Sequence, residues 1–94
     1  MNEFHAPRLM KALAAELPQG FTAKYDPAPD DSVDDQIIIL HNGKDTDISV
    51  QVGIDAMCTV NEWREDEQAI YHAPSRPVTA YRAIISDVLV RLPK

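Results

Sequence analysis

The sequence predicts an α+β domain: an antiparallel β-meander of three to five strands, flanked by N- and C-terminal helices packed on one face. Three observations predict it. The chain has 94 residues, which suits a single domain spanning residues 1–94. Apolar residues recur at helical spacing near both ends and at alternate positions between them. The connections between the alternating segments are short, which favours antiparallel neighbours.

The first helix is expected over residues 7–17, with Pro7 in the first turn, where its missing N–H would be unpaired anyway. Pro18 and Gly20 are expected to end it. One face of this helix carries the apolar side chains Leu9, Met10, Leu13, Ala14 and Leu17.

Alternation predicts a strand over residues 21–25, and Asn42-Gly43 predicts a tight turn between strands at 36–41 and 46–52. A two-residue turn would pair Ile37 with Ile48 and Ile39 with Thr46; a four-residue loop would keep the same faces. Either arrangement predicts one core face, made of Val33, Ile37, Ile39, Ile48, Val50 and Val52. Ile38 and Leu40 then lie on the opposite face.

Residues 57–63 are expected to form a fourth strand, and residues 68–73 a short fifth strand after a charged turn at 64–67. The segment 75–77 is expected to open the last helix, which Pro93 ends. Its apolar stripe would be Val78, Tyr81, Ile84, Ile85, Val88, Leu89 and Leu92.

The net charge of −6 is unevenly distributed. Residues 26–67 contain twelve acidic and two basic side chains, a net −10, whereas the remainder contains three acidic and seven basic side chains, a net +4. An acidic middle segment repels phosphate and argues against nucleic-acid binding. A single cysteine, no leader-like N-terminus and no long apolar run together predict a cytoplasmic protein that does not enter a membrane.

Each pattern that could mark a metal or catalytic site is incomplete. Asp30, Ser32 and Asp34 alternate as in a calcium loop, but Asp35 occupies the position where that loop needs glycine. The histidines and the cysteine have none of the spacings typical of zinc sites: His5, His41, His72 and Cys58. The two acidic clusters, at 30–35 and 62–67, are expected at opposite ends of the meander. The sequence therefore predicts no cofactor, no metal and no catalytic residues.

The residue types that commonly anchor protein interfaces are concentrated in the second half of the chain. Trp63, Tyr71 and either Arg64 or Arg76 form one candidate group. The remaining candidate interface residues are the second-face pair Ile38 and Leu40 and the loop acids Asp30 and Asp31. Cys58 is interpreted as a small core residue.

The order of one helix, three strands and one helix is similar to that of a double-stranded RNA-binding domain. That family carries a lysine-rich stretch at the start of its last helix, whereas residues 75–79 here contain one basic side chain, Arg76. Because the strand loops are also acidic, direct nucleic-acid binding is not expected.

These observations predict a non-enzymatic interaction module of a small bacterial or phage-like protein. It would bind a protein partner through a sheet edge, the exposed sheet face or the acidic loops. Two alternatives stay open: an acidic nucleic-acid mimic that inhibits a DNA- or RNA-binding enzyme, and a small enzyme using Cys58 with a histidine. A homodimer is compatible with all three.

Overall fold

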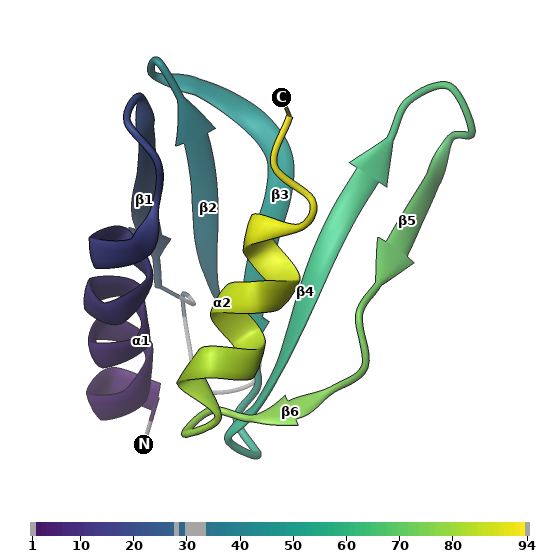
Figure 1. Ribbon diagram of the computed structural model, residues 1–94. Helices are drawn as coiled ribbons and strands as arrows, with labels where there is room; N and C mark the ends of the chain where they lie inside the picture. Colours follow the sequence, from purple (N-terminus) through teal and green to yellow (C-terminus); the bar gives the residue numbers. More distant parts are fainter. Residues whose placement is uncertain (1, 28, 30–33, 94) are drawn as a thin grey trace.

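Both helices lie on the same face of one antiparallel sheet (Figure 1). The computed structural model describes residues 2–27, 29 and 34–93, with side chains from residue 6 onward. Neighbouring strands pair in the order β1-β2-β3-β4-β5, and β6 pairs with β4. The predicted fold class is therefore confirmed. The elements in chain order are α1 (Asn2–Glu16), β1 (Phe21–Asp26), β2 (Asp35–His41), β3 (Lys44–Val52), β4 (Met57–Arg64), β5 (Ala69–His72), β6 (Arg76–Pro77) and α2 (Tyr81–Leu89).

The core lies between the helices and one face of the sheet. α1 packs on β1 and β2, α2 packs on β3 and β4, and the two helices touch each other. The sheet contributes alternate residues that are nearly inaccessible: Ile37, Ile39, Ile48, Val50, Val52, Cys58 and Val60. Every described member of the predicted core face is thus buried, and Cys58 joins it. Val33 lies outside the described residues.

The β2–β3 hairpin combines two registers. At the turn, Asn42 and Gly43 have φ of 52° and 82°, the left-handed values that a two-residue hairpin turn requires. His41 pairs with Lys44 and Leu40 with Asp45, but further on Ile38 pairs with Ser49 and Ile37 with Val50. The expected pairing of Ile37 with Ile48 is therefore wrong, although both side chains remain on the core face.

A bulge in β3 accounts for the change of register. Asp47 has a φ of 64°, and its backbone N–H bonds to the Asp45 carboxylate at 2.7 Å. The Thr46 hydroxyl donates to the Ile39 carbonyl at 2.7 Å and accepts from the Ile48 N–H at 3.3 Å. These side-chain bonds supply partners for backbone groups near the bulge. Because the bulge adds two residues to β3, side chains on either side of it still alternate between the same two faces of the sheet.

The helix starts differ from the predicted ones. α1 begins at Asn2, so Pro7 lies inside the helix, where it removes one backbone hydrogen bond, rather than in its first turn. The segment 75–77 does not open α2: Arg76 pairs with Cys58 and Pro77 with Met57 as β6. The helix begins only at Tyr81.

An ion pair joins β6 to α2. Arg76 Nε lies 2.8 Å from Asp87 Oδ2. The hydrogen bond to Asp87, followed by its negative charge, raises the pKa of Arg76 above its usual value. The pair links the short strand β6 to the helix that follows it.

Candidate interaction surface

The sheet face opposite the helices, called the open face below, consists of the residues that alternate with the buried ones. Alternate side chains of a strand point to opposite sides of a sheet, so strand pairing determines its members. The members used below are Lys24, Ile38, Leu40, Ser49, Gln51, Thr59, Asn61, Trp63, Ile70 and His72. In Figure 1 both helices lie in front of the sheet, and the open face is behind it.

An exposed apolar pair lies on the open face of the β4–β5 hairpin. Trp63 and Ile70 are direct cross-strand partners. Trp63 is 41% exposed and Ile70 is 55% exposed. Figure 1 shows β5 beyond the area that α2 covers. Ile38 and Leu40 of β2, which were predicted to lie opposite the core face, are also on the open face and are half-buried.

A chain of side-chain hydrogen bonds crosses the open face from β3 to β5. Gln51 Nε2 donates to Asp34 Oδ2 at 2.5 Å, and Asn61 Nδ2 donates to Gln51 Oε1 at 3.2 Å. Because the Asn61 nitrogen is the donor in that bond, its Oδ1 is left to accept from His72 Nδ1 at 2.5 Å. The polar side chains in the middle of the open face are therefore linked by direct hydrogen bonds.

A pocket of about 460 Å³ lies at the end of the open face nearest the β3–β4 turn. Ile54, which is 54% exposed, and Met57 contribute its apolar wall. The Thr59 and Ser75 hydroxyl oxygens lie 3.1 Å apart. The polar lining is rich in hydrogen-bond acceptors: Asp34, Gln51, Asp55, Thr59 and Ser75.

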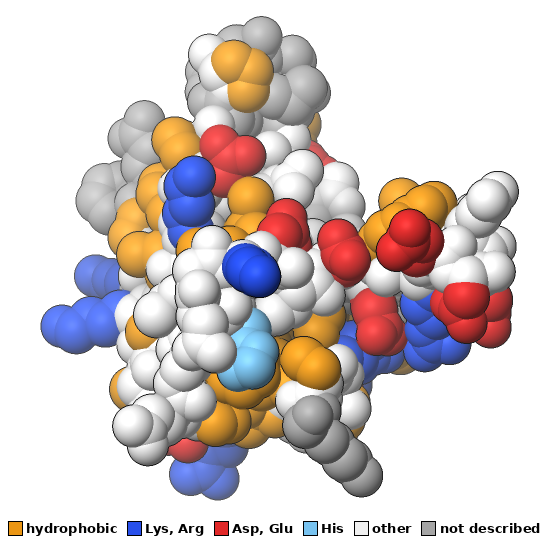
Figure 2. Space-filling model, turned by 90° about the horizontal axis from the view of Figure 1, so that it is seen from above, with side chains coloured by type: hydrophobic (Ala, Val, Ile, Leu, Met, Phe, Trp, Pro, Cys, Tyr) orange, Lys and Arg blue, Asp and Glu red, His pale blue; other side chains and the backbone are white. Residues whose placement is uncertain are grey.

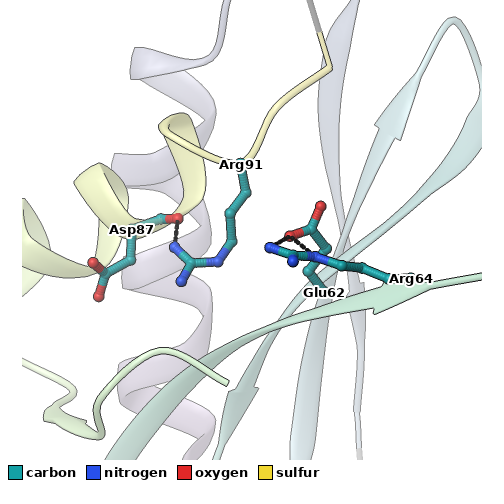
Figure 3. Close-up of polar contacts among 4 residues, drawn as sticks. All are labelled: Glu62, Arg64, Asp87 and Arg91. Carbon is teal, nitrogen blue, oxygen red and sulfur yellow. Dashed lines mark hydrogen bonds and ion pairs between the residues drawn. The ribbon is translucent and has the colours of Figure 1, made fainter. Parts of the chain in front are cut away.

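A separate cluster of charged side chains lies on the helix side of the β4–β5 hairpin (Figure 3). The Arg64 guanidinium lies 3.8 Å from the Tyr71 ring centroid and bonds to Glu62 Oε1 at 3.3 Å. From the end of α2, Arg91 Nη1 donates to the Asp87 carbonyl at 2.6 Å. Arg91 Nε is buried and has no hydrogen-bond partner among the described residues.

The predicted Trp–Tyr–Arg group is therefore divided between the two sides of the sheet. Arg64 and Tyr71 do meet, but Trp63 points to the open face and Arg76 binds Asp87 instead. Ile70 was missing from the predicted set. The signal that could have revealed it is its alternation with Tyr71 in a strand following a short charged turn. Asp30 and Asp31 lie outside the described residues.

Acidic side chains gather at the end of the sheet that bears the β2–β3 and β4–β5 turns. Figure 2 views the molecule from this end and shows carboxylates running from the middle of the sheet out to the projecting hairpin. The exposed acids around this end are Asp45, Asp47, Glu65, Asp66 and Glu67. Asp34 is far from them, since it touches Gln51 near the other end of β3.

Cys58 is poorly suited to be a nucleophile. It is 1% exposed, and burial, followed by the charge of Asp55, raises its pKa to about 11. Reactive cysteines have lowered pKa values. The candidate partners lie elsewhere, since His72 is bonded to Asn61 on the open face and His41 stacks on Phe21 at 4.3 Å. His5 has no described side chain. Across the described side chains, no three potential metal ligands come together.

Searches of protein-family models, curated proteins and solved structures returned no match. Neither helix in the described part of the chain is long and apolar enough to cross a membrane.

Proposed function

We propose that this protein is a non-enzymatic interaction module that binds a protein partner through the open face of its sheet. The observation that carries the proposal is the side-by-side exposure of Trp63 and Ile70 on that face. Large apolar side chains grouped on a surface are typical of protein interfaces, and tryptophan is enriched among the residues that dominate binding energy.

The hydrogen-bonded polar side chains beside this pair support the same proposal. Covering a polar group costs free energy when its hydrogen bonds with water are lost and not replaced. Because Gln51, Asn61 and His72 are already bonded to one another, a partner can cover them at a reduced cost. The open face thus combines exposed apolar side chains with polar side chains that are partly hydrogen-bonded to each other.

Site-specific photo-crosslinking tests the proposal. A photoreactive amino acid at Ile70 is expected to give a discrete adduct in extracts of the native host, and Trp63→Ser is expected to abolish it. Val90 provides the matched control, because it is 74% exposed but follows α2 on the helix side. Equal adducts from both positions, or none from Ile70, would contradict the proposal. An adduct of two copies of this chain would identify a homodimer as the partner.

The two alternatives predict different results. For a nucleic-acid mimic, neutralising the acidic turn by Glu65→Gln, Asp66→Asn and Glu67→Gln would abolish binding, and Trp63→Ser would not. For an enzyme using Cys58, the folded protein would react rapidly with a thiol reagent at neutral pH. The high pKa and burial of Cys58 support the opposite expectation.

A further inference from the structure

We propose that the segment which occupies the open face is a basic amphipathic helix of a partner protein. This inference rests on the proposed function and names its partner class. Three features of the open face lead to it: the charge around its edges, the kind of backbone that can lie on it, and the distance between its apolar pair and its acidic pocket.

The charge around the open face favours a cationic partner. Lys24 is the basic residue among its members, and Lys44 and Arg64 are basic residues beside the turns at its edge. The acids on the face or at its edges are more numerous: Asp26, Asp34, Asp45, Asp47, Asp55, Glu65, Asp66 and Glu67. A second copy docked face to face about a two-fold axis along β3 would bring Asp45 and Asp47 close to their own equivalents. Like charges held this close oppose association, so the second copy is the less favourable occupant.

The backbone of the occupant must satisfy its own hydrogen bonds. A strand lying flat on the face would leave its N–H and C=O groups unpaired, whereas a helix bonds them internally. The opposite face of the same sheet already accommodates two helices, so the open face is wide enough for one. An amphipathic helix would cover Trp63 and Ile70 with its apolar stripe.

The pocket suits a lysine or arginine side chain. Asp34 and Asp55 supply negative charge, and Thr59 and Ser75 supply further acceptor oxygens. The wall formed by Ile54 and Met57 can pack against the methylene stem of a long basic side chain. The pocket therefore matches both parts of such a side chain.

The distance between pocket and apolar pair sets a spacing for the partner. Thr59 of the pocket and Trp63 of the pair are four residues apart on β4, which corresponds to about 13 Å. A helix rises about 1.5 Å per residue, so about nine of its residues cover that span. The positions on the same helix face closest to this value are i+7 and i+8. We therefore expect apolar residues at i and i+3 or i+4, and a cation at i+7 or i+8.

A designed peptide tests the inference directly. The probe is an alanine-rich helical peptide of about 18 residues with leucine at i and i+3 and arginine at i+7 and i+8. Trp63 is the only tryptophan in the chain, so its emission reports binding at the open face. We expect a blue shift on titration, and a Kd about fivefold to tenfold lower than for the same peptide with both arginines changed to glutamine.

Variants of the protein supply the matched control. Asp34→Asn and Asp55→Asn keep oxygens that can accept the existing hydrogen bonds from Gln51 and Met57 while removing the charge. The double variant is expected to bind the arginine peptide about fivefold to tenfold more weakly. Glu16→Gln removes a charge from the exposed end of α1 and is expected to leave Kd unchanged.

Several outcomes would overturn the inference, and they are distinct from failure of the proposed function. Equal binding of the glutamine peptide would remove the cation requirement but leave an apolar docking face. Equal binding of an arginine peptide without leucine would make recognition purely electrostatic and remove the amphipathic requirement. No shift of Trp63 emission with any peptide would overturn the helix proposal, while crosslinking from Ile70 would still decide whether the face binds a partner.

Discussion

The covered and open faces of the sheet are built from the same strands but differ in how their side chains are stabilised. On the covered face, Ile37, Val50 and Val60 are buried beneath the helices. On the open face, Gln51, Asn61 and His72 bond to one another, and Trp63 and Ile70 stay exposed. Buried apolar side chains are therefore concentrated on the covered face, and we expect substitutions there to cost the fold more than substitutions on the open face.

Truncation on the covered face is expected to have the largest effect on stability. Ile37 is fully buried, so Ile37→Ala should lower the free energy of unfolding by about 2–5 kcal/mol through lost burial and the cavity it leaves. Urea denaturation followed by circular dichroism measures the loss. If Ile37→Ala lowered the free energy of unfolding no more than truncation of an exposed apolar residue does, the two faces would not differ in their contribution to stability.

Cys58, which lies on the covered face, is expected to make the free energy of unfolding depend on pH. Its pKa is raised from 9.0 to about 11, so the folded protein retains the thiol proton to higher pH than the unfolded chain does. The protonated thiol contributes fully to the free energy of unfolding below about pH 9, and this contribution is lost as the pH rises toward 11. The decrease should amount to at most about 3 kcal/mol, because each unit of pKa difference corresponds to about 1.4 kcal/mol.

The matched variant for this measurement is Cys58→Ala, which removes the titrating group. The difference in unfolding free energy between wild type and variant should change between pH 9 and 11 and stay constant between pH 6 and 8. A difference that stays constant across the whole range would indicate that the thiol is not shielded from water.

Breaking the polar chain on the open face should cost less. Asn61→Ala removes the side-chain bonds to Gln51 and His72, and we expect a loss of about 1 kcal/mol because this face is partly solvated. Nitrogen chemical shifts of His72 provide a second measurement. In the wild type, neutral His72 should carry its proton on Nδ1, and the variant should lose that preference.

The smallest effect is expected for the exposed apolar pair. Ile70→Ala should change the free energy of unfolding by less than about 0.5 kcal/mol, since the side chain is 55% exposed. The same substitution should nevertheless weaken partner binding. A stability loss comparable to that of Ile37→Ala would mean that Ile70 serves the fold, which would contradict its assignment to the interaction surface.

Much of the fold could be predicted because alternation is a local property of the sequence. Ile37, Ile39 and Val52 were assigned to the core face by their spacing alone, and they are buried. The positive φ of Asn42 and Gly43 follows from residue type in the same way. The candidate site was less predictable. Ile38 and Leu40 fell on the open face as expected, but the prediction grouped Trp63 with Tyr71, and the two side chains point to opposite sides of the sheet.

The sequence by itself determined which residues face the core and where the chain reverses, because both depend on the spacing and conformational preferences of near neighbours. Only the tertiary structure decided the pairing of β2 with β3, where a bulge at Thr46 and Asp47 shifts the register by two residues. It also decided that Arg76 and Pro77 pair with β4 instead of beginning α2, because β4 offers them backbone partners. These outcomes depend on residues far apart in the chain.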